Sequence, residues 1–310
     1  MNRSVLLIVG PTAVGKTALS IEVAKRLGGE IISADSRQVY RYMDIGTAKP
    51  TRDELTAVPH HFIDHKTPDE YYSAGEYATE ARACIRVLFE RGVVPIVVGG
   101  SGLYLRALVD GLAGPGIADE EVKQALKAAI REKGLGVLFD ELRAVDPVTA
   151  GRLHATDTQR ILRALEVYRI SGRPFSALVS QEEVAADFAP VFVGLTMARE
   201  RLYRRIEERA ASMIEQGLVE EARRLQDLGY GSDLNSLQTV GYKEAFDFLD
   251  GYLTRERMTV LIKQKTRNYA KRQITWFRKE KRIQWLDQSD SPDSHSTIAQ
   301  IGEIFSTSST

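Results

Sequence analysis

The sequence predicts an α/β fold in which helices flank a parallel sheet, with an all-helical insertion and a helical C-terminal region. Over residues 1–110, short β-branched apolar runs alternate with helical segments, which is the order of parallel strands joined by crossover helices. Residues 119–172 then carry helical patterns only, and one more strand-like run follows at 190–195. The helical stretch therefore interrupts the α/β part of the chain.

The elements of the first part follow from their hydrophobic periodicity. The strands are predicted from continuous apolar runs that end at turn residues, and they cover 4–9, 30–34 and 93–98. The helices are predicted from apolar residues at helical spacing, and they cover 16–27, 73–91 and a segment that starts near 102. Gly28 is placed to close the first helix, and Ser73 is a suitable N-cap for the second.

The remaining boundaries follow from changes in composition. A Gly/Pro-rich segment at 111–118 marks the start of the insertion, and helical patterns resume after 195 and continue to about 280. Beyond 287 the chain is rich in Ser and Asp, which predicts a mobile tail, although the apolar residues between Ile298 and Phe305 could dock. The predicted organisation is a core of 1–115 and 190–286, a helical insertion over 116–189 and a tail over 287–310.

The composition is that of a globular protein of about two domains. The chain has 310 residues, of which 43% are hydrophobic and 27% charged, which excludes wholesale disorder. Its 42 basic and 42 acidic residues give no net charge, so a globally basic nucleic-acid binder is excluded but a local basic patch is not. Cys84 is the only cysteine, and no apolar run has the length of a membrane span or signal sequence. We expect a cytoplasmic protein without a membrane partner.

Between the first predicted strand and helix, the sequence matches G-x-x-x-x-G-K-[ST] in full. The eight residues are Gly10, Pro11, Thr12, Ala13, Val14, Gly15, Lys16 and Thr17. In such a loop, backbone N–H groups and a helix N-terminus converge on a phosphate, the lysine neutralises its oxygens, and the Thr17 hydroxyl can ligate Mg²⁺. A chance glycine-rich turn is the alternative, and the strand-loop-helix context argues against it. The loop predicts a P-loop NTPase-like core that binds a polyphosphate, whether or not that ligand is a nucleotide.

Asp35 follows the second predicted strand and so lies at its carboxyl end. In open α/β sheets, ligands gather at this edge, beside the phosphate-binding loop. A carboxylate there could hold Mg²⁺ or act as a general base, and it could equally be an Asx-turn residue that ends the strand. Ser36, Arg37 and Gln38 follow it as polar groups that could recognise a partner.

Several further stretches resemble the tRNA dimethylallyltransferases, also called tRNA isopentenyltransferases. They occur in matching order between about residues 4 and 285, and they are D-S-R-Q-V-Y at 35–40, M-D-I-G-T-A-K-P at 43–50, P-I-V-V-G-G-S-G-L-Y at 95–104, D-x-Q-R-x-x-R-A-L-E at 157–166, G-Y-K-E at 241–244 and T-R-x-x-A-K-R-Q-x-T-W-F at 266–277. Ser101 stands where the family usually has Thr, so the hydroxyl is retained and a methyl group is lost.

The resemblance implies transfer of a dimethylallyl group from dimethylallyl diphosphate to N6 of adenosine 37, beside the tRNA anticodon. The P-loop would then hold the diphosphate leaving group, with Lys16 and with Mg²⁺ on Thr17. Asp35 would accept the proton from N6, Ser101 would bond to the target nucleotide or to the base, and Arg209 would add charge to the cluster. Arg201 and Arg205 share the i,i+4 spacing of Arg209, and for these two we expect a solvated surface with glutamate partners.

The same resemblance implies which residues face the anticodon stem-loop. They are Asp35, Ser36, Arg37, Gln38, Ser101, Lys123, Gln159, Arg160, Ile161, Leu162, Arg163, Gly241, Tyr242, Lys243, Lys263, Arg267, Lys271 and Arg272. Independently of it, residues 263–282 contain nine basic residues and one acidic residue, a local charge of +8 in a neutral chain. That density of one sign predicts a nucleic-acid-binding surface. The resemblance implies that such a surface would also offset the few kcal/mol that extruding the adenine from its stack costs. We expect a monomer.

Three other functions share parts of this pattern. A small-molecule P-loop kinase would use the loop and Asp35 without the basic C-terminal segment. An isopentenyltransferase that acts on free adenine nucleotides would do without the tRNA-binding segments, and a non-catalytic RNA-binding module would not need Asp35. His60, His61 and His65 lack the spacing of a metal site, so we expect loop or strand-end histidines, and we expect Cys84 and His154 to be structural.

Overall fold

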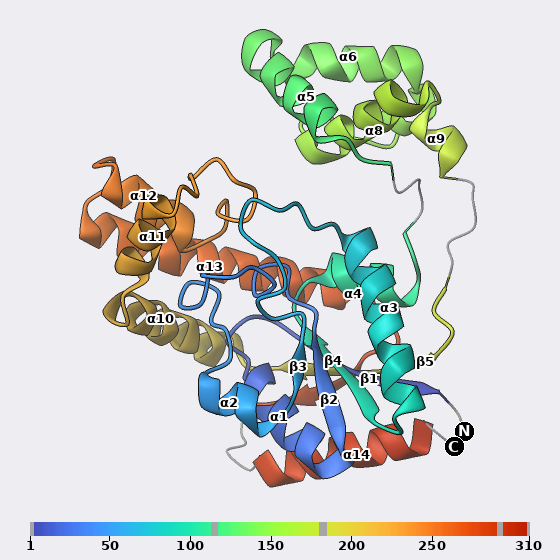
Figure 1. The fold of residues 1–310 in the computed structure, drawn as a ribbon, viewed down its shortest axis with the longest axis vertical. Coiled ribbons are helices and arrows are strands. Elements are labelled where there is room, and N and C mark those ends of the chain that lie inside the picture. Colours follow the sequence, from blue (N-terminus) through green and yellow to red (C-terminus); the bar gives the residue numbers. More distant parts are fainter. Residues whose placement is uncertain (1–2, 113–116, 180–184, 290–293, 309–310) are drawn as a thin grey trace. The chain divides into compact units, whose positions relative to one another are not determined.

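The computed structural model describes residues 3–112, 117–179, 185–289 and 294–308. The chain divides into two compact units, one formed by Met1–Val109 with Ala186–Thr310 and the other by Asp110–Ala185. Figure 1 shows the first unit as a sheet with helices on both sides and the second as helices only. None of the helices in the described ranges combines the length and apolarity that crossing a membrane requires.

The sheet of the first unit has strand order β3-β2-β4-β1-β5-β6, and every pair is parallel. The strands are β1 Ser4–Val9, β2 Gly29–Ser33, β3 His60–His61, β4 Val94–Gly99, β5 Ala189–Thr196 and β6 Gln284–Asp287. The predicted strands are confirmed to within a residue or two at each end, whereas β3 and β6 were not predicted. β1 lies at the centre, with β4 and β5 as its neighbours, which explains why all six of its residues are buried.

Helices pack on both faces of the sheet. In the first unit they are α1 Lys16–Leu27, α2 Arg52–Ala57, α3 Ala74–Glu90, α4 Gly102–Val109, α10 Arg199–Glu215, α11 Leu218–Asp227, α12 Tyr242–Leu249, α13 Arg255–Phe277 and α14 Ser294–Ser308. Side chains alternate along β1, so Leu6 and Ile8 belong to the apolar cluster with α1 and α14, while Leu7 and Val9 belong to the cluster with α3 and α4. This alternation places the two main cores on opposite faces of one sheet.

Residues 294–308 of the predicted tail are helical, and they include the segment from Ile298 to Phe305 that was expected to be able to dock. They form α14, which packs beside α1 below the sheet in Figure 1. Ile298 is 7% exposed and Ile301 is fully buried, because their spacing puts both on the face toward α1 and β5. Residues 290–293 and 309–310 of the predicted tail lie outside the described residues.

The second unit is the all-helical insertion. It contains α5 Glu120–Lys133, α6 Leu135–Val145, α7 Pro147–Ala150, α8 Thr158–Ser171 and α9 Phe175–Leu178. Its core is built from apolar residues of α5, α6 and α8, with Leu126, Leu142 and Ile161 fully buried. Asp157 caps α8, since its side chain accepts the N–H of Arg160.

Candidate functional site

The phosphate-binding loop joins β1 to α1 at the carboxyl end of the sheet. Gly10 has a φ of 145°, and a Cβ there would lie 2.6 Å from the carbonyl oxygen of Leu195, so only glycine fits. Gly15 has a φ of 108° and directly precedes the first residue of α1. The Lys16 ammonium donates to the carbonyl oxygens of Gly10 at 2.9 Å and Pro11 at 2.8 Å. The loop therefore has the folded-back form in which Lys16 lies across a phosphate cradle.

Two cations and a carboxylate meet at this loop. Burial lowers the pKa of Lys16 to about 8, partly opposed by the negative charge of Asp35 and reinforced by Arg209. Burial likewise lowers the pKa of Arg209, with Asp35 acting in the opposite direction. The Arg209 guanidinium donates to the hydroxyl of Thr12. Arg209 thus comes from α10 to the loop, as the resemblance implied for it.

Asp35 lies one residue beyond Ala34 at the end of β2, and one of its carboxylate oxygens is fixed by an Asx turn. Its Oδ1 accepts the N–H of Arg37 at 2.9 Å and that of Gln38 at 3.4 Å. Among the described residues, none donates a hydrogen bond to its Oδ2. Asp35 can therefore be both an Asx-turn residue and a functional carboxylate. Its Oδ1 fixes the orientation of the carboxylate, and its Oδ2 is left for a ligand.

Ser101 follows the Gly99-Gly100 turn at the end of β4 and contacts the segment that carries Asp35. Its hydroxyl accepts the N–H of Ser36 at 3.0 Å and lies 3.3 Å from the Ser36 hydroxyl. Its own N–H donates to the carbonyl oxygen of Ala34 at 3.2 Å. A hydroxyl at position 101 is therefore sufficient for this connection, and none of the three bonds uses the methyl group that threonine would add.

Three neighbouring cavities share lining residues, and Asp35 lines two of them. The phosphate cavity, of about 530 Å³, is lined by the loop with Lys16 and Thr17. The central cavity, of about 280 Å³, shares Thr12, Asp35, Thr47 and Arg209 with it and has an apolar wall that includes Ile206, Met213 and Ile262. The aromatic cavity, of about 370 Å³, shares Ser36, Arg37, Tyr269 and Arg272 with the central one and is lined by Tyr104 and Trp276. Asp35 thus lies between the phosphate cavity and the central cavity, and the central cavity in turn shares residues with the aromatic one.

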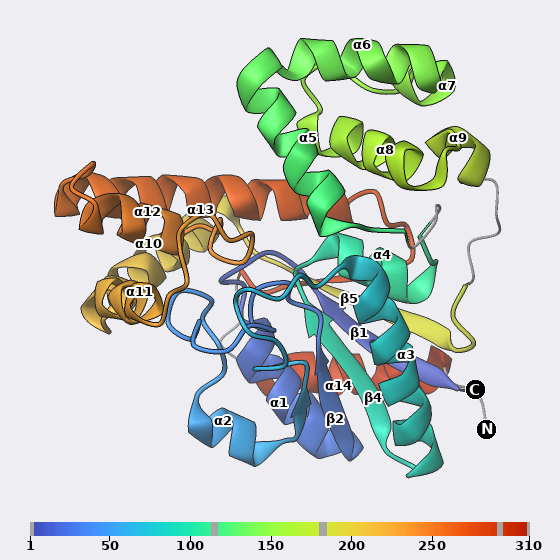
Figure 2. The ribbon, with the colours of Figure 1, turned by 45° about the horizontal axis from the view of Figure 1, so that its top comes forward.

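Gln273 holds α13 against this site and was not predicted as a site residue. It is 6% exposed, its Oε1 accepts the N–H of Thr12 at 2.8 Å, and its Nε2 donates to the carbonyl oxygen of Gly100 at 3.0 Å. One side chain therefore joins the phosphate loop, the turn before Ser101 and the basic helix. In Figure 2, α13 runs across the end of the sheet at which these turns lie. The sequence signal was a glutamine that interrupts a strongly basic helix.

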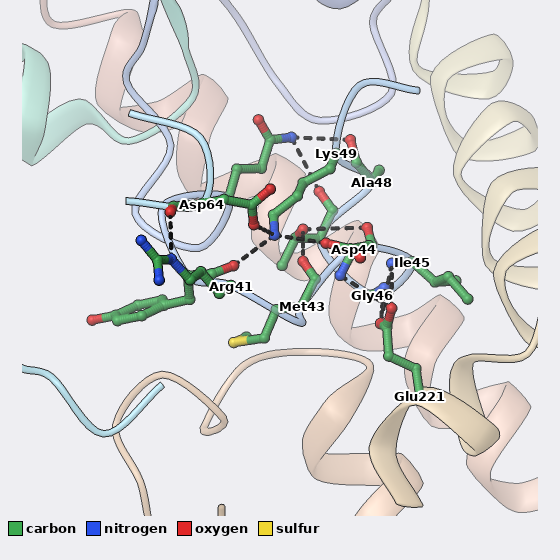
Figure 3. Close-up of polar contacts among 12 residues, drawn as sticks. Arg41, Met43, Asp44, Ile45, Gly46, Ala48, Lys49, Asp64 and Glu221 are labelled. Carbon is green, nitrogen blue, oxygen red and sulfur yellow. Dashed lines mark hydrogen bonds and ion pairs between the residues drawn. The ribbon is translucent and has the colours of Figure 1, made fainter. Parts of the chain in front are cut away.

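Glu221 organises the loop at 43–49, and sequence reasoning missed it as well. Its carboxylate accepts the N–H groups of Asp44, Ile45 and Gly46 at 3.0–3.1 Å and the hydroxyl of Tyr242 at 2.5 Å, as Figure 3 shows for the three amides. Glu221 is 2% exposed. The loop that it holds carries Thr47 into the central and phosphate cavities.

Lys49 closes the same loop from its other end. Its ammonium bonds to Asp44 at 2.7 Å, to Asp64 at 2.5 Å and to the carbonyl oxygen of Tyr40 at 2.6 Å (Figure 3). Gln38, which was expected to face tRNA, donates its Nε2 to the carbonyl oxygens of Thr47 at 3.2 Å and Ala48 at 3.0 Å. The side chain of Gln38 therefore stabilises the loop at 43–49.

Three of the residues expected to contact tRNA have buried side chains. Tyr242 and Ile161 are fully buried, and Leu162 is 9% exposed. Tyr242 packs under the loop at 43–49 and bonds to Glu221, while the other two form the core of the helical unit. Packing in the apolar clusters explains why these three side chains are buried, and none of the three could contact a macromolecule directly unless the protein unfolded locally.

Other predicted contact residues lie at the surface with protein partners. Arg163 donates to the carbonyl oxygen of Ile117 and pairs with Glu166, and Lys123 lies 3.3 Å from Glu120. Gln159, Arg160 and Lys243 are exposed, whereas Gly241 is buried with a φ of 102° and begins α12. Arg37 donates to the carbonyl oxygens of Asn235 and Ser236.

The basic surface on and after α13 is smaller than its sequence suggested. Lys265 pairs with the buried Glu244 at 2.6 Å, and Arg267 pairs with Glu207 at 2.6 Å. Lys263 is half-buried on the same helix. The cations that remain exposed with no carboxylate partner among the described residues are Lys271, Arg272, Arg278, Lys279 and Lys281.

Arg205 is exposed, as expected for it, but it has no glutamate partner among the described residues. A Cβ added to Gly15 would lie 3.7 Å from its Nη2 and 3.8 Å from its Nη1, and Arg205 lines the phosphate cavity. Arg201 instead donates to the carbonyl oxygen of Ser289. The i,i+4 pair Arg205 and Arg209 therefore faces the loop from one side of α10.

The histidines and the cysteine that were set aside have partners of their own. His60 and His61 form β3, and His61 bonds to Glu30 at 2.8 Å, while His65 bonds to Glu80 at 2.7 Å. Cys84 lies in α3 and packs against the core, and burial raises the pKa of its thiol to about 11. None of these four residues lines the phosphate, central or aromatic cavity.

Comparisons with known proteins give one consistent result. The sequence profile of the family described as IPP transferase matches residues 38–280. The tRNA dimethylallyltransferase of Geobacillus kaustophilus strain HTA426 is 45% identical over 302 residues, which cover 97% of this chain and 96% of that protein.

Solved structures agree with the sequence comparison. The full-length tRNA isopentenylpyrophosphate transferase from Bacillus halodurans is 40% identical with a TM-score of 0.73, covering 99% of this chain and 98% of that one. A eukaryotic dimethylallyltransferase acting on tRNA is 28% identical with a TM-score of 0.79, covering 98% of this chain and 80% of that one. These likenesses, together with the parallel sheet and the loop after β1, confirm the P-loop NTPase-like core.

Proposed function

Because this chain belongs to the IPP transferase family, we propose that it transfers a dimethylallyl group from dimethylallyl diphosphate to N6 of adenosine 37 in tRNA. The observation that carries the proposal is the position of Asp35, which lines both the phosphate cavity and the central cavity. A donor held in the first cavity and a base that approaches through the aromatic cavity meet at this carboxylate. The product is the N6-dimethylallyl nucleoside, with diphosphate released.

The diphosphate occupies the phosphate cavity, where Lys16, Arg209 and the amides of the loop surround it. The dimethylallyl chain extends into the central cavity, whose wall offers the apolar side chains of Ile206, Met213 and Ile262. As the C1–O bond breaks, its electron pair goes to the diphosphate. The positive charges at the loop stabilise that developing charge more than they stabilise the bound substrate, which lowers the barrier.

The adenine reaches Asp35 from the aromatic cavity, where Tyr104, Tyr269 and Trp276 offer ring faces to an extruded base. The N6 lone pair attacks C1 of the allyl group, and the proton lost from N6 goes to Oδ2 of Asp35. Ser101 bonds to the neighbouring Ser36 and so keeps the segment with Asp35 in place. The same hydroxyl lines the cavity through which the base arrives.

The residues of the phosphate cavity also fit a magnesium ion. The Thr17 hydroxyl and the Asp35 carboxylate both line it, and oxygen ligands of this kind suit Mg²⁺, which also keeps waters and binds phosphate oxygens. Thr17 would hold the ion beside the loop. When bound, Mg²⁺ supplies further positive charge to the diphosphate oxygens.

The tRNA is held by exposed basic residues of both units. On α13 these include Lys271 and Arg272, and on α8 they include Arg160. Phosphate contacts of this kind position a nucleic acid without reading its sequence. We further propose that the protein acts as a monomer in the cytoplasm, where its tRNA substrate is found.

The proposal is tested with labelled dimethylallyl diphosphate, Mg²⁺ and unmodified tRNA, followed by digestion and analysis of the nucleosides. Label in N6-dimethylallyladenosine at position 37 is the expected result. Parallel reactions receive AMP or ATP in place of tRNA. Label in a free nucleotide would instead support an isopentenyltransferase of free adenine nucleotides, and phosphoryl transfer from ATP would support a kinase.

Asp35→Asn is the decisive variant for the proton acceptor. It retains the size and the turn-forming oxygen of Asp35, so binding of tRNA and diphosphate should persist while single-turnover transfer falls by about 100-fold or more, the loss expected for a missing general base. Rates near those of the unaltered chain would remove Asp35 from that role.

A further inference from the structure

Three cations face the phosphate cavity, and Asp35, the carboxylate whose charge acts on two of them, forms an ion pair with none. Lys16, Arg205 and Arg209 all line it, and none has a carboxylate within ion-pair distance among the described residues. Glu54 and Glu208 line the same cavity, but Glu54 accepts the N–H of Thr51 at the start of α2, and neither carboxylate pairs with the three cations. Such a cluster of like charges is unfavourable until an anion joins it.

The two arginines reach the cavity because of their spacing on α10. Residues 205 and 209 are one turn apart, so both side chains project to the same face of the helix. Their proximity has an electrostatic consequence, since the positive charge of Arg205 contributes to lowering the pKa of Arg209. Among the described residues, Arg205 has no carboxylate partner. Its near neighbour at the cavity is Arg209, whose positive charge repels it.

Arg205 and Arg209 line different sets of cavities, so they can contact different parts of a bound ligand. Arg209 lines both the phosphate cavity and the central cavity, as Asp35 does, so it lies near the bond that breaks. Arg205 lines the phosphate cavity but not the central one, and its guanidinium lies beside Gly15 at the start of α1. Arg205 thus faces the part of the diphosphate that is farther from the reacting carbon.

We propose that Arg205 is a second diphosphate-binding arginine, which contacts the terminal phosphate while Arg209 contacts the phosphate attached to the prenyl group. The inference rests on the proposed function, because it takes the ligand of the phosphate cavity to be a diphosphate. A planar guanidinium suits this contact, since it can donate two parallel hydrogen bonds to phosphate oxygens. Arg205 should bind the diphosphate equally well before and after the C1–O bond breaks. Its loss should therefore weaken binding of dimethylallyl diphosphate without slowing the chemical step.

The test compares Arg205→Ala with Arg204→Ala in the full-length chain. Arg204 is exposed on the same helix and lines none of the three cavities, so the two variants lose the same charge one residue apart. Binding of inorganic pyrophosphate in the presence of Mg²⁺ is measured by calorimetry. Arg205→Ala should weaken it by about 10- to 100-fold, as expected for a lost charge-assisted bidentate contact, and Arg204→Ala by no more than about twofold.

Steady-state kinetics give the second measurement. Arg205→Ala should raise KM for dimethylallyl diphosphate with little change in kcat, leave KM for tRNA unchanged, and recover in part in Arg205→Lys. If the Arg204→Ala and Arg205→Ala variants bound pyrophosphate equally well, the inference about Arg205 would be overturned. The proposed function would still stand in that case, provided that the unaltered chain transferred the prenyl group. An unaltered chain that bound no pyrophosphate and transferred no prenyl group would overturn both.

Discussion

Lys16 is the residue whose ionisation should set the alkaline limit of donor binding. Its pKa in the ligand-free chain is lowered to about 8 by burial, so the ammonium that binds phosphate is present below pH 8 and is lost above it. We expect kcat/KM for dimethylallyl diphosphate to fall about tenfold per pH unit above that value. Bound diphosphate favours the charged lysine, so the decline in kcat should begin at a higher pH.

The same titration has a second measurable consequence. Between pH 8 and 9, binding of pyrophosphate should take up a proton, which calorimetry in buffers of different ionisation enthalpy detects. Lys16→Arg keeps its charge in this range, so proton uptake by the protein should disappear. A flat profile of kcat/KM from pH 7 to 9.5 would show that Lys16 remains charged in the free protein.

Single residues show where prediction from sequence succeeded and where it failed. The loop from Gly10 to Thr17 is contiguous and has a spacing that its chemistry requires, so it was predicted in full. Gln273 acts on residues 261 and 173 positions away, and no local pattern records such a partner. The exposure of Arg205 was expected but its place at the phosphate cavity was not, since helical spacing fixes which residues share a face but not what that face meets.

At the level of elements, Glu221 connects α11 to the loop at 43–49 by accepting hydrogen bonds from its backbone N–H groups. We expect Glu221→Gln to weaken this connection. The glutamine amide keeps the shape but replaces one acceptor with a donor that faces buried N–H groups. We expect the free energy of unfolding to fall by about 2–4 kcal/mol, since several buried donors lose a charged acceptor. Activity should fall as well, because the loop carries Thr47 into the cavities. Urea denaturation and single-turnover assays measure the two effects.

Tyr242→Phe is the matched control for this element. It removes one of the four donors to Glu221 and leaves the three amides of the loop in place. A loss of about 1 kcal/mol is expected, with activity largely retained. If Tyr242→Phe proved as harmful as Glu221→Gln, the contacts to the loop would not be the main contribution of Glu221.

The elements that sequence reasoning missed are those stabilised by tertiary packing. β3 has two residues and β6 has four, so neither is long enough to display a period. α14 has an apolar stripe within a segment rich in Ser and Thr, and its helix is supported by contacts with α1 and β5. By contrast, β1 and β4 are central strands, and their continuous apolar runs identified them without any knowledge of neighbours.

For the whole molecule, the distribution of charge matters more than its sum. The chain has no net charge, yet folding pairs many of its charges and leaves unpaired cations exposed on and just after the C-terminal end of α13. The sequence predicted that basic segment but overstated it, because Glu207 and Glu244 come from distant elements to neutralise two of its members. A local positive field on a neutral protein favours a polyanion that binds at one place over general adhesion to nucleic acid.

That field predicts how tRNA binding responds to salt. The combined change Lys271→Ala, Arg278→Ala and Lys279→Ala removes three exposed cations that line none of the three cavities. The slope of log Kd for tRNA against log salt concentration should decrease by about 2 to 3, while pyrophosphate affinity stays unchanged. A triple change of Lys25, Arg26 and Arg86 to Ala, exposed cations of α1 and α3, removes the same charge elsewhere and should leave the slope unaltered. Equal decreases in the two triple variants would mean that net charge, and not this end of α13, governs the encounter with tRNA.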